Sequence, residues 1–359
     1  MSELKKLQDA GQSVWLDNMR RDLLSTGTLA RYIQDLSVSG LTSNPTIFEK
    51  AISGSADYDA DIRSLAARGL SPEQIFFELA LDDLRGAADL LRPVFDGGRG
   101  RDGFVSLEVS PTLAYDATGT VAQARDLFAR AGRPNFLIKV PGTQEGALAI
   151  EELIAAGVPI NVTLLFSVEH CEAAALAYVR GLERRAEAGL ELEIASVASL
   201  FISRWDGKTA GALPERLRHR LGIAIGSRSY RLFRDLFASS RWKRLAARGA
   251  RPQRLLWAST GVKDPSLPSS YYVTALAAKD TINTLPEATL LDFGQHGRVG
   301  DLLDGDTREA DQVLAGAASA GIDMVALASE LQTQGAQSFV DSWNGLLRGI
   351  QERSSHLRS

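Results

Sequence analysis

The strongest constraint on the fold is a regular alternation of short apolar segments and longer amphipathic segments along the 359 residues. Short apolar runs that are bounded by glycine, proline or charge and rich in β-branched or aromatic residues are typical of buried strands. Eight such runs occur, at residues 14–17, 38–44, 104–109, 135–141, 159–166, 192–201, 255–260 and 281–285. The last run is weaker than the others.

Segments with helical periodicity lie between these runs. Residues 72–92 predict a helix with Ser71 as its N-cap and Pro72 at its first position, where proline loses no intrahelical hydrogen bond. Amphipathic patterns over residues 121–131, 145–156 and 168–188 predict three more helices.

Eight strands that alternate with helices predict an α/β fold, and specifically a (β/α)8 TIM barrel. The main rival is an open doubly wound sheet, which usually carries a glycine-rich turn after its first strand; the residues after Asp17 contain none. We therefore expect a single barrel domain over residues 1–359, with a helical insertion at 205–253 and C-terminal helices at 302–356 packed on the barrel. The insertion is basic, and we interpret it as solvated helices, with phosphate attraction or subunit contact as the alternative.

The composition excludes several classes of protein. With 45% hydrophobic and 23% charged residues, the chain is neither fibrous nor globally disordered. A net charge of −4 does not favour nucleic acid or an acidic membrane as a partner, and no apolar run is long enough to cross a membrane. A single cysteine (Cys171), four scattered histidines and an N-terminus without a signal sequence favour a cytoplasmic protein with no metal site.

Lys139 is the most unusual residue in a predicted strand, because it lies inside the apolar run FLIKVP at 136–141. In a barrel of this kind, the C-terminal ends of the strands face the active site. Burial disfavours a charged ammonium, and a neutral amine attacks a carbonyl to form a Schiff base. The alternative interpretation is an edge lysine whose amine reaches the solvent.

Two carboxylates occupy comparable positions in neighbouring strands. Glu108 is a candidate general acid or base, and its alternative role is as the partner of Lys139 in a buried ion pair. Asp17 ends the first strand, where the local sequence alone favours a helix N-cap over a role in chemistry.

Two further strand ends carry polar residues whose role the local sequence leaves open. The TSNPT segment at 42–46 is either part of a site or only a turn and a helix start, since Pro45 suits the first helical position. Asn161 and Thr163 have the spacing of two residues that places them on the same side of a strand. Inward polar groups in an apolar strand need partners, because leaving them unpaired costs free energy.

The sixth and seventh strand ends carry groups that suit an anion. Ser199 is followed by Arg204, and Ser259 is followed by Lys263. Hydroxyls, backbone amides and cations in the loops after late strands often form a phosphate site in this architecture. A lysine, two carboxylates and an anion site on one rim suit aldol chemistry on a phosphorylated sugar.

These segments resemble the transaldolase family over nearly the whole chain. The resemblance rests on GLTSNPTIFEKAI (40–52), SLEVSPTLAYD (106–116), NFLIKVPGTQEG (135–146), INVTLLFS (160–167) and LLWASTGVKDP (255–265). The ASTGVK form of the seventh strand and the 205–253 insertion are similar to the longer bacterial branch of the family, which includes actinobacterial enzymes.

The resemblance implies a class I aldolase barrel that works without a metal or an organic cofactor. It implies the reversible transfer of a dihydroxyacetone unit from sedoheptulose 7-phosphate to glyceraldehyde 3-phosphate, giving erythrose 4-phosphate and fructose 6-phosphate. This reaction belongs to the non-oxidative branch of the pentose phosphate pathway. The implied partners are phosphorylated ketose and aldose sugars, and we expect a monomer or a homodimer.

The resemblance also implies roles for individual residues. Lys139 matches the Schiff-base lysine, and Asp17 matches the acid/base that takes the proton of the C4 hydroxyl during carbon–carbon cleavage. Glu108 matches a carboxylate that acts through a water in forming and breaking the imine, and Thr163 matches the residue that holds this water. The other matches are substrate contacts: Asn44 and Asn161 to the dihydroxyacetone hydroxyls, Ser199 to the substrate, and Arg204 and Ser259 to the phosphate.

The sequence departs from the family pattern at two places. Better-known members carry an arginine two residues after the serine of strand seven, where this chain has Gly261; we expect Lys263 to replace the missing charge. After Ser199, the segment SLFISR lacks the proline that commonly follows. Both departures concern the geometry of the phosphate site.

Three alternatives to a transaldolase remain at this point. A fructose 6-phosphate aldolase-like enzyme would release free dihydroxyacetone, and Glu108 together with the long chain argues against it. A non-catalytic sugar-phosphate-binding barrel would be expected to lack one of Lys139, Asp17 and Glu108, yet all three are present. A fusion with a phosphohexose isomerase would need a further domain, for which we expect no room within 359 residues.

Overall fold

The computed structural model describes residues 2–356, and at its centre eight parallel strands form a closed barrel. The strands are β1 (Ser13–Asp17), β2 (Val38–Thr42), β3 (Val105–Glu108), β4 (Phe136–Pro141), β5 (Ile160–Leu165), β6 (Ser196–Phe201), β7 (Arg254–Ala258) and β8 (Ile282–Leu285). Each strand pairs with the next one in the sequence, and β8 pairs with β1 to close the ring. The predicted (β/α)8 barrel is confirmed, and the open doubly wound sheet is excluded.

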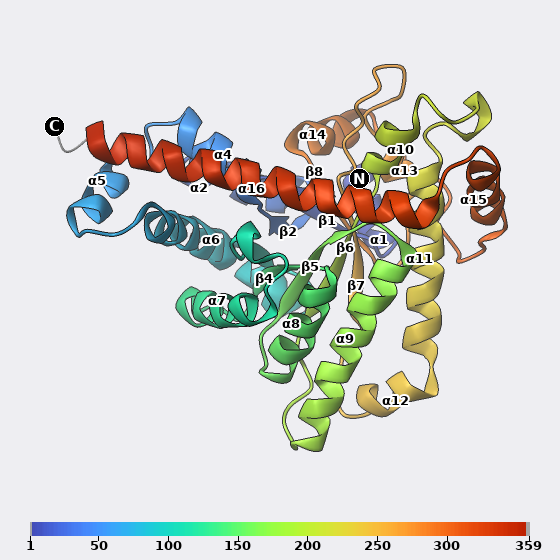
Figure 1. Ribbon diagram of the computed structural model, residues 1–359, viewed down its shortest axis with the longest axis horizontal. Helices are drawn as coiled ribbons and strands as arrows, with labels where there is room; N and C mark the ends of the chain where they lie inside the picture. The colour runs from blue at the N-terminus through green and yellow to red at the C-terminus, as the bar shows by residue number, and fades with distance from the viewer. Residues whose placement is uncertain (1, 357–359) are drawn as a thin grey trace.

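Helices follow the strands and surround the barrel (Figure 1). They are α1 (Glu3–Asp9), α2 (Asp22–Ser25), α3 (Thr28–Asp35), α4 (Pro45–Gly54), α5 (Asp59–Ala67), α6 (Pro72–Gly97), α7 (Ala117–Ala131), α8 (Gln144–Ala155), α9 (Val168–Glu187), α10 (Ser203–Thr209), α11 (Leu221–Ala238), α12 (Ser240–Ala246), α13 (Tyr271–Ala275), α14 (Glu287–His296), α15 (Arg308–Ser319) and α16 (Met324–His356). Two short 3-10 helices, η1 (Pro111–Leu113) and η2 (Glu215–Leu217), complete the connections.

The ends of the predicted elements are confirmed where the capping chemistry is clear. Ser71 caps α6 as expected, and Gln74 completes a capping box by accepting from the Ser71 amide.

The prediction for the sixth strand is wrong at its start, because residues 192–195 are not a strand and β6 begins at Ser196. Leu192 is buried there, so its apolar character reflects packing rather than strand pairing.

The insertion between β6 and β7 is helical and is tied to the rest of the chain by ion pairs. Arg241 of α12 pairs with Glu183 of α9 at 2.7 Å, and Arg228 of α11 pairs with Asp311 of α15 at 2.8 Å. Basic side chains of this region therefore form ion pairs with carboxylates of neighbouring helices.

The long helix α16 returns across the barrel and lies beside α4, α5 and α6 (Figure 1, red). The Gln332 side chain donates to the carbonyl of Gly142 at 3.0 Å and to that of Leu164 at 2.9 Å. Further along, Ser342 and Thr46 hydrogen-bond at 2.8 Å. These contacts hold α16 against the C-terminal ends of β2, β4 and β5, which is the end where a barrel places its active site.

Among residues 2–356, no single helix is long and apolar enough to cross a membrane. The helices Arg308–Ser319 and Met324–Ser355 reach the necessary length and apolar composition only when they are taken together, and the two are bent by 91° at their junction.

Trp15 of β1 is fully buried and donates its indole N–H to Asp102, just before β3, at 2.6 Å. Gly40 is the strand neighbour of Trp15, and a Cβ at this glycine would lie 2.4 Å from the indole ring. Glycine is therefore required here by close packing of the ring against the β2 backbone.

We expect Gly40→Ala to lower the free energy of unfolding by about 1–3 kcal/mol, because the added methyl group overpacks a dense interior. Gly54→Ala is the matched control, since nothing lies within 4 Å of a Cβ at this helix end. Urea denaturation measures both variants, and equal stability of the two would contradict the packing role of Gly40.

Candidate active site

A pocket of about 300 Å³ opens at the C-terminal end of the barrel. Most of the residues predicted for the site line it: Asp17, Asn44, Lys139, Thr163, Ser199, Arg204, Ser259 and Lys263. Glu108 and Asn161 do not line it, and instead lie behind the lining in contact with residues that do. The structure thus brings together residues from strands that are far apart in the sequence.

Lys139 is buried, with 5% of its surface exposed, so the interpretation as a solvent-reaching edge lysine is wrong. Its amine lies 3.2 Å from a carboxylate oxygen of Glu108 and donates to the carbonyl of Ser43 at 2.9 Å. The strand register accounts for the pair, since Glu108 of β3 is the direct neighbour of Lys139 of β4. The buried ion pair that the sequence offered as the alternative role of Glu108 is therefore present.

Burial also changes the acidity of the two carboxylates. Loss of hydration raises the pKa of Glu108, and the nearby charge of Lys139 only partly offsets this effect. Desolvation raises the pKa of Asp17 as well, against the opposing effects of Lys139 and of a 2.7 Å hydrogen bond from Thr42. Both carboxyl groups are therefore better proton acceptors than ordinary surface carboxylates.

Asp17 does not cap a helix. The following helix, α2, begins only at Asp22 and has no side-chain cap at its N-terminus. The N-cap interpretation of Asp17 is therefore wrong, and the carboxylate lies in the pocket instead.

Asn44 and Asn161 differ in how many hydrogen bonds their side-chain amides already form within the protein. Asn44 is the N-cap of α4, where its side-chain oxygen accepts from the Ile47 amide at 3.0 Å, and the side chain still lines the pocket. Asn161 accepts from Ser199 at 2.7 Å and donates to Ser106 at 3.1 Å. Asn161 thus holds Ser199 from behind the pocket wall.

Several polar atoms at the base of the pocket remain unpaired. Within the described residues, the hydroxyl of Thr163 accepts and donates no hydrogen bond, and Glu108 has only its contact with Lys139. Buried polar groups are nearly always hydrogen-bonded in folded proteins, and exceptions cluster at functional sites. The Thr163 hydroxyl is therefore available to a reactant in the pocket, whereas Glu108 lies behind the lining in contact with Lys139.

Backbone strain adjoins the site at two positions. Leu164, directly after Thr163, has φ of 59°, and Ser259 has φ of 54°. This left-handed region is unfavourable for residues other than glycine and costs about 1–3 kcal/mol at each position. The carbonyl of Leu164 accepts from Gln332 of α16, so the C-terminal helix stabilises one of the strained turns.

The outer part of the pocket is positively charged. Arg204, Lys50 and Lys263 line it together with the hydroxyls of Ser203 and Ser259, and Asp17 is the one carboxylate among the described lining residues. Within the described residues, none of these three cations forms an ion pair with a carboxylate. An anion is the natural complement of such a rim.

Sequence reasoning missed several residues that line the pocket, among them a lysine and two phenylalanines. Lys50 lies on the same face of α4 as Thr46 and Ile47, so helical spacing from the TSNP turn would have found it. Phe201 is two residues after Ser199 and shares its side of the strand. Phe339 comes from α16, and no local pattern connects it with the barrel.

Within residues 2–356, no group of three or more His, Cys, Asp and Glu side chains is arranged so that it could hold a metal ion.

The fold and the pocket define an enzyme of the (β/α)8 class with a buried lysine as its candidate nucleophile. Residues 14–350 match a family model described as Transaldolase/Fructose-6-phosphate aldolase. The chain belongs to this transaldolase/fructose-6-phosphate aldolase family.

Several relatives of similar length are named transaldolase. The chain is 46% identical to the transaldolase of Saccharopolyspora erythraea, with 98% of each chain covered. It is 45% identical to the transaldolases of Parafrankia sp., with 98% of this chain and 97% of the relative covered, and of Thermobifida fusca, with 99% of each covered. Such coverage supports transaldolase activity rather than that of an aldolase or a non-catalytic barrel.

The charged rim predicts that the pocket binds a free anion. We expect Arg204→Gln to weaken the binding of inorganic phosphate roughly 10- to 100-fold, because a charge-assisted hydrogen bond contributes about 1.5–3 kcal/mol. Arg216→Gln is the control, since this arginine lies exposed in η2, away from the pocket. Calorimetric titration gives both affinities, and equal values would place the anion elsewhere.

Proposed function

We propose that the chain transfers a dihydroxyacetone unit between phosphorylated sugars through a Schiff base on Lys139. The observation that carries the proposal is the buried Lys139–Glu108 pair at 3.2 Å beneath a pocket with a cationic rim. The donor is sedoheptulose 7-phosphate and the acceptor glyceraldehyde 3-phosphate, so the products are erythrose 4-phosphate and fructose 6-phosphate. The proposal also includes a single-domain cytoplasmic enzyme, monomeric or homodimeric, without a nucleic-acid or membrane partner.

Substrate orientation follows from the distribution of charge in the pocket. The phosphate binds at the rim to Arg204, Ser259 and Lys263, and the carbonyl end of the sugar extends inward to Lys139. The polar groups of Asn44 and Ser199 line the space between these ends and receive the sugar hydroxyls.

Imine formation begins with proton transfer from Lys139. The raised pKa of Glu108 makes its carboxylate a good acceptor for the proton that the amine must lose before it attacks. The neutral amine adds to C2 of the ketose, and the C2 oxygen then leaves as water. Glu108 supplies protons to the leaving oxygen, and the free hydroxyl of Thr163 holds the water in the pocket.

Carbon–carbon cleavage is the task of Asp17. Its carboxylate accepts the proton of the C4 hydroxyl, C4 becomes the carbonyl carbon of the departing aldose, and the C3–C4 bond breaks. The electron pair of this bond moves to the protonated imine and leaves an enamine on Lys139. The acceptor aldose then forms the new bond by the same steps in reverse.

A transferase must keep the enamine intact until the acceptor arrives. Phe201 and Phe339 line the pocket, and α16 covers this end of the barrel, so apolar surface limits the access of water. Retention of the enamine separates a transferase from an aldolase that releases dihydroxyacetone.

The test compares fructose 6-phosphate alone with fructose 6-phosphate plus erythrose 4-phosphate. We expect sedoheptulose 7-phosphate to form rapidly with both sugars, and free dihydroxyacetone to appear only slowly with the ketose alone. Lys139→Ala should abolish both products, whereas Lys243→Ala, which changes an exposed lysine of α12, should abolish neither. Release of dihydroxyacetone as fast as transfer would support the aldolase instead.

The pH dependence of turnover follows from the protonation state that Asp17 must have to accept a proton. Only the ionised carboxylate accepts the C4 proton, and the ionised fraction falls as the pH drops through the pKa of this group. Because desolvation raises that pKa, we expect the acid limb of kcat to lie above the ordinary carboxyl value of about 4.

The measurement is kcat against pH, with circular dichroism over the same range to separate the limb from unfolding. An acid limb at the ordinary carboxyl value would show that Asp17 is not the proton acceptor, or that its surroundings do not perturb it.

A further inference from the structure

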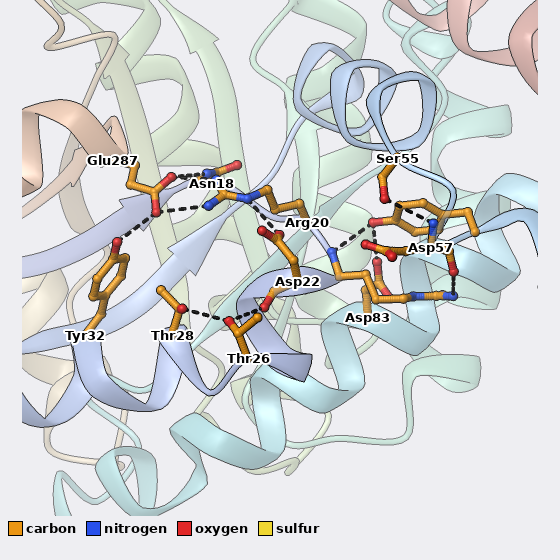
Figure 2. A network of polar contacts seen from close by, with 12 residues as sticks. Asn18, Arg20, Asp22, Thr26, Thr28, Tyr32, Ser55, Asp57, Asp83 and Glu287 are labelled. Atoms are coloured by element: carbon orange, nitrogen blue, oxygen red, sulfur yellow. Dashed lines mark hydrogen bonds and ion pairs between the residues drawn. The ribbon is translucent and has the colours of Figure 1, made fainter.

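The segment that follows Asp17 is held on both sides by polar contacts that the reaction itself does not use. Residues 18–21 connect β1 to α2, and Figure 2 shows one set of contacts around Glu287 and a second set around Asp83. Asp17 itself has one side-chain hydrogen bond, from Thr42 at 2.7 Å, among the described residues. Asp17 is the last residue of β1, so the segment that these contacts hold begins directly after it.

The first set joins this segment to α14, directly after β8. The Glu287 carboxylate accepts from Asn18 at 3.0 Å, from Arg20 at 2.5 Å and from Tyr32 at 2.9 Å. These hydrogen bonds and the charge of Arg20 keep the pKa of Glu287 below its usual range, although its partial burial acts in the other direction. An ionised carboxylate thus ties the first residues after Asp17 to the neighbouring strand end.

The second set joins the segment to α6. Arg21 donates to Asp83 at 2.9 Å, and its guanidinium lies 4.5 Å from the centre of the Tyr58 ring. The Tyr58 hydroxyl donates to Asp83 at 2.9 Å and accepts from the backbone amide of Arg21 at 3.0 Å. Tyr58 and Asp83 are 1% and 3% exposed, so both the backbone and the side chain of Arg21 are fixed to buried groups.

Stability alone does not explain this second set. Taking the charges of Asp83 and Arg21 out of water is unfavourable, and apolar residues of similar size often stabilise a fold as well as a buried ion pair does. What directional, buried hydrogen bonds add is a defined geometry. The geometry that they define here lies four residues from the proposed proton acceptor.

We propose that Arg21, Asp83 and Glu287 are positioning residues that hold the carboxylate of Asp17 toward the C4 hydroxyl of the substrate. The proposal rests on the proposed function, since it assigns to Asp17 the cleavage step. Lys139 lies on β4 and Glu108 on β3, and their contacts are with each other and with the Ser43 carbonyl, outside both sets. Loosening residues 18–21 should therefore slow cleavage and leave imine formation intact.

The two steps can be read separately by quenching a single turnover of fructose 6-phosphate with borohydride, which reduces the imine to a stable amine. An imine trapped before cleavage leaves a six-carbon adduct on the protein, and one trapped after cleavage leaves a three-carbon adduct. Intact mass gives both amounts over time. In Asp83→Asn, we expect the three-carbon adduct to form about 10- to 100-fold more slowly, as for a small misplacement of a catalytic group, while the total adduct forms at the wild-type rate.

The matched control is Asp89→Asn, which removes a carboxylate of the same helix from its exposed ion pair with Arg133 at 2.6 Å. This control should leave both adducts unchanged. If Asp83→Asn does not fold, Tyr58→Phe replaces it, because this change keeps the ring beside Arg21 and removes the hydroxyl that bridges its amide to Asp83.

A wild-type ratio of adducts in the folded variant would overturn the positioning role. A parallel fall of both adducts would overturn it as well, because that result indicates a general structural role. No adduct with the wild-type protein would instead contradict the proposed function, so the two failures are distinguishable.

Discussion

The ion pair between Lys139 and Glu108 is the interaction on which the candidate site depends. Neither charge would be stable alone at this depth, and the register of β3 and β4 places them side by side at 3.2 Å. The same pairing allows a proton to move from amine to carboxylate without solvent. In the proposed mechanism, this proton transfer leaves Lys139 as the nucleophile for a carbonyl substrate.

The remaining parts of the site divide by depth. At the base lie carboxylates with raised pKa and a free hydroxyl, which suit proton transfer. At the rim lie cations without carboxylate partners within the described residues, which suit a phosphate. Apolar side chains, including Phe339 of α16, lie with them around the pocket. In the proposed mechanism, the rim binds the phosphate and the base carries out the proton transfers, so one pocket serves both tasks.

Much of the fold and most of the site could be predicted from the sequence, because both depend on local patterns. Short apolar runs predict strands, and Lys139 is conspicuous because it interrupts such a run, although only the structure excludes the solvent-reaching alternative. The sequence could not show that α2 begins only at Asp22, so that Asp17 is not its N-cap. The residues between them contact Glu287 and Asp83, which lie far along the chain and form no local pattern with Asp17. Phe339 and the strained Leu164 also depend on where α16 docks.

The central claim is that Lys139 carries the substrate as an imine. The most direct test is borohydride reduction of the wild-type protein in the presence of fructose 6-phosphate, followed by peptide mapping. The account predicts one three-carbon adduct, on the peptide that contains Lys139. An adduct on another lysine, or none on a folded protein, would contradict it.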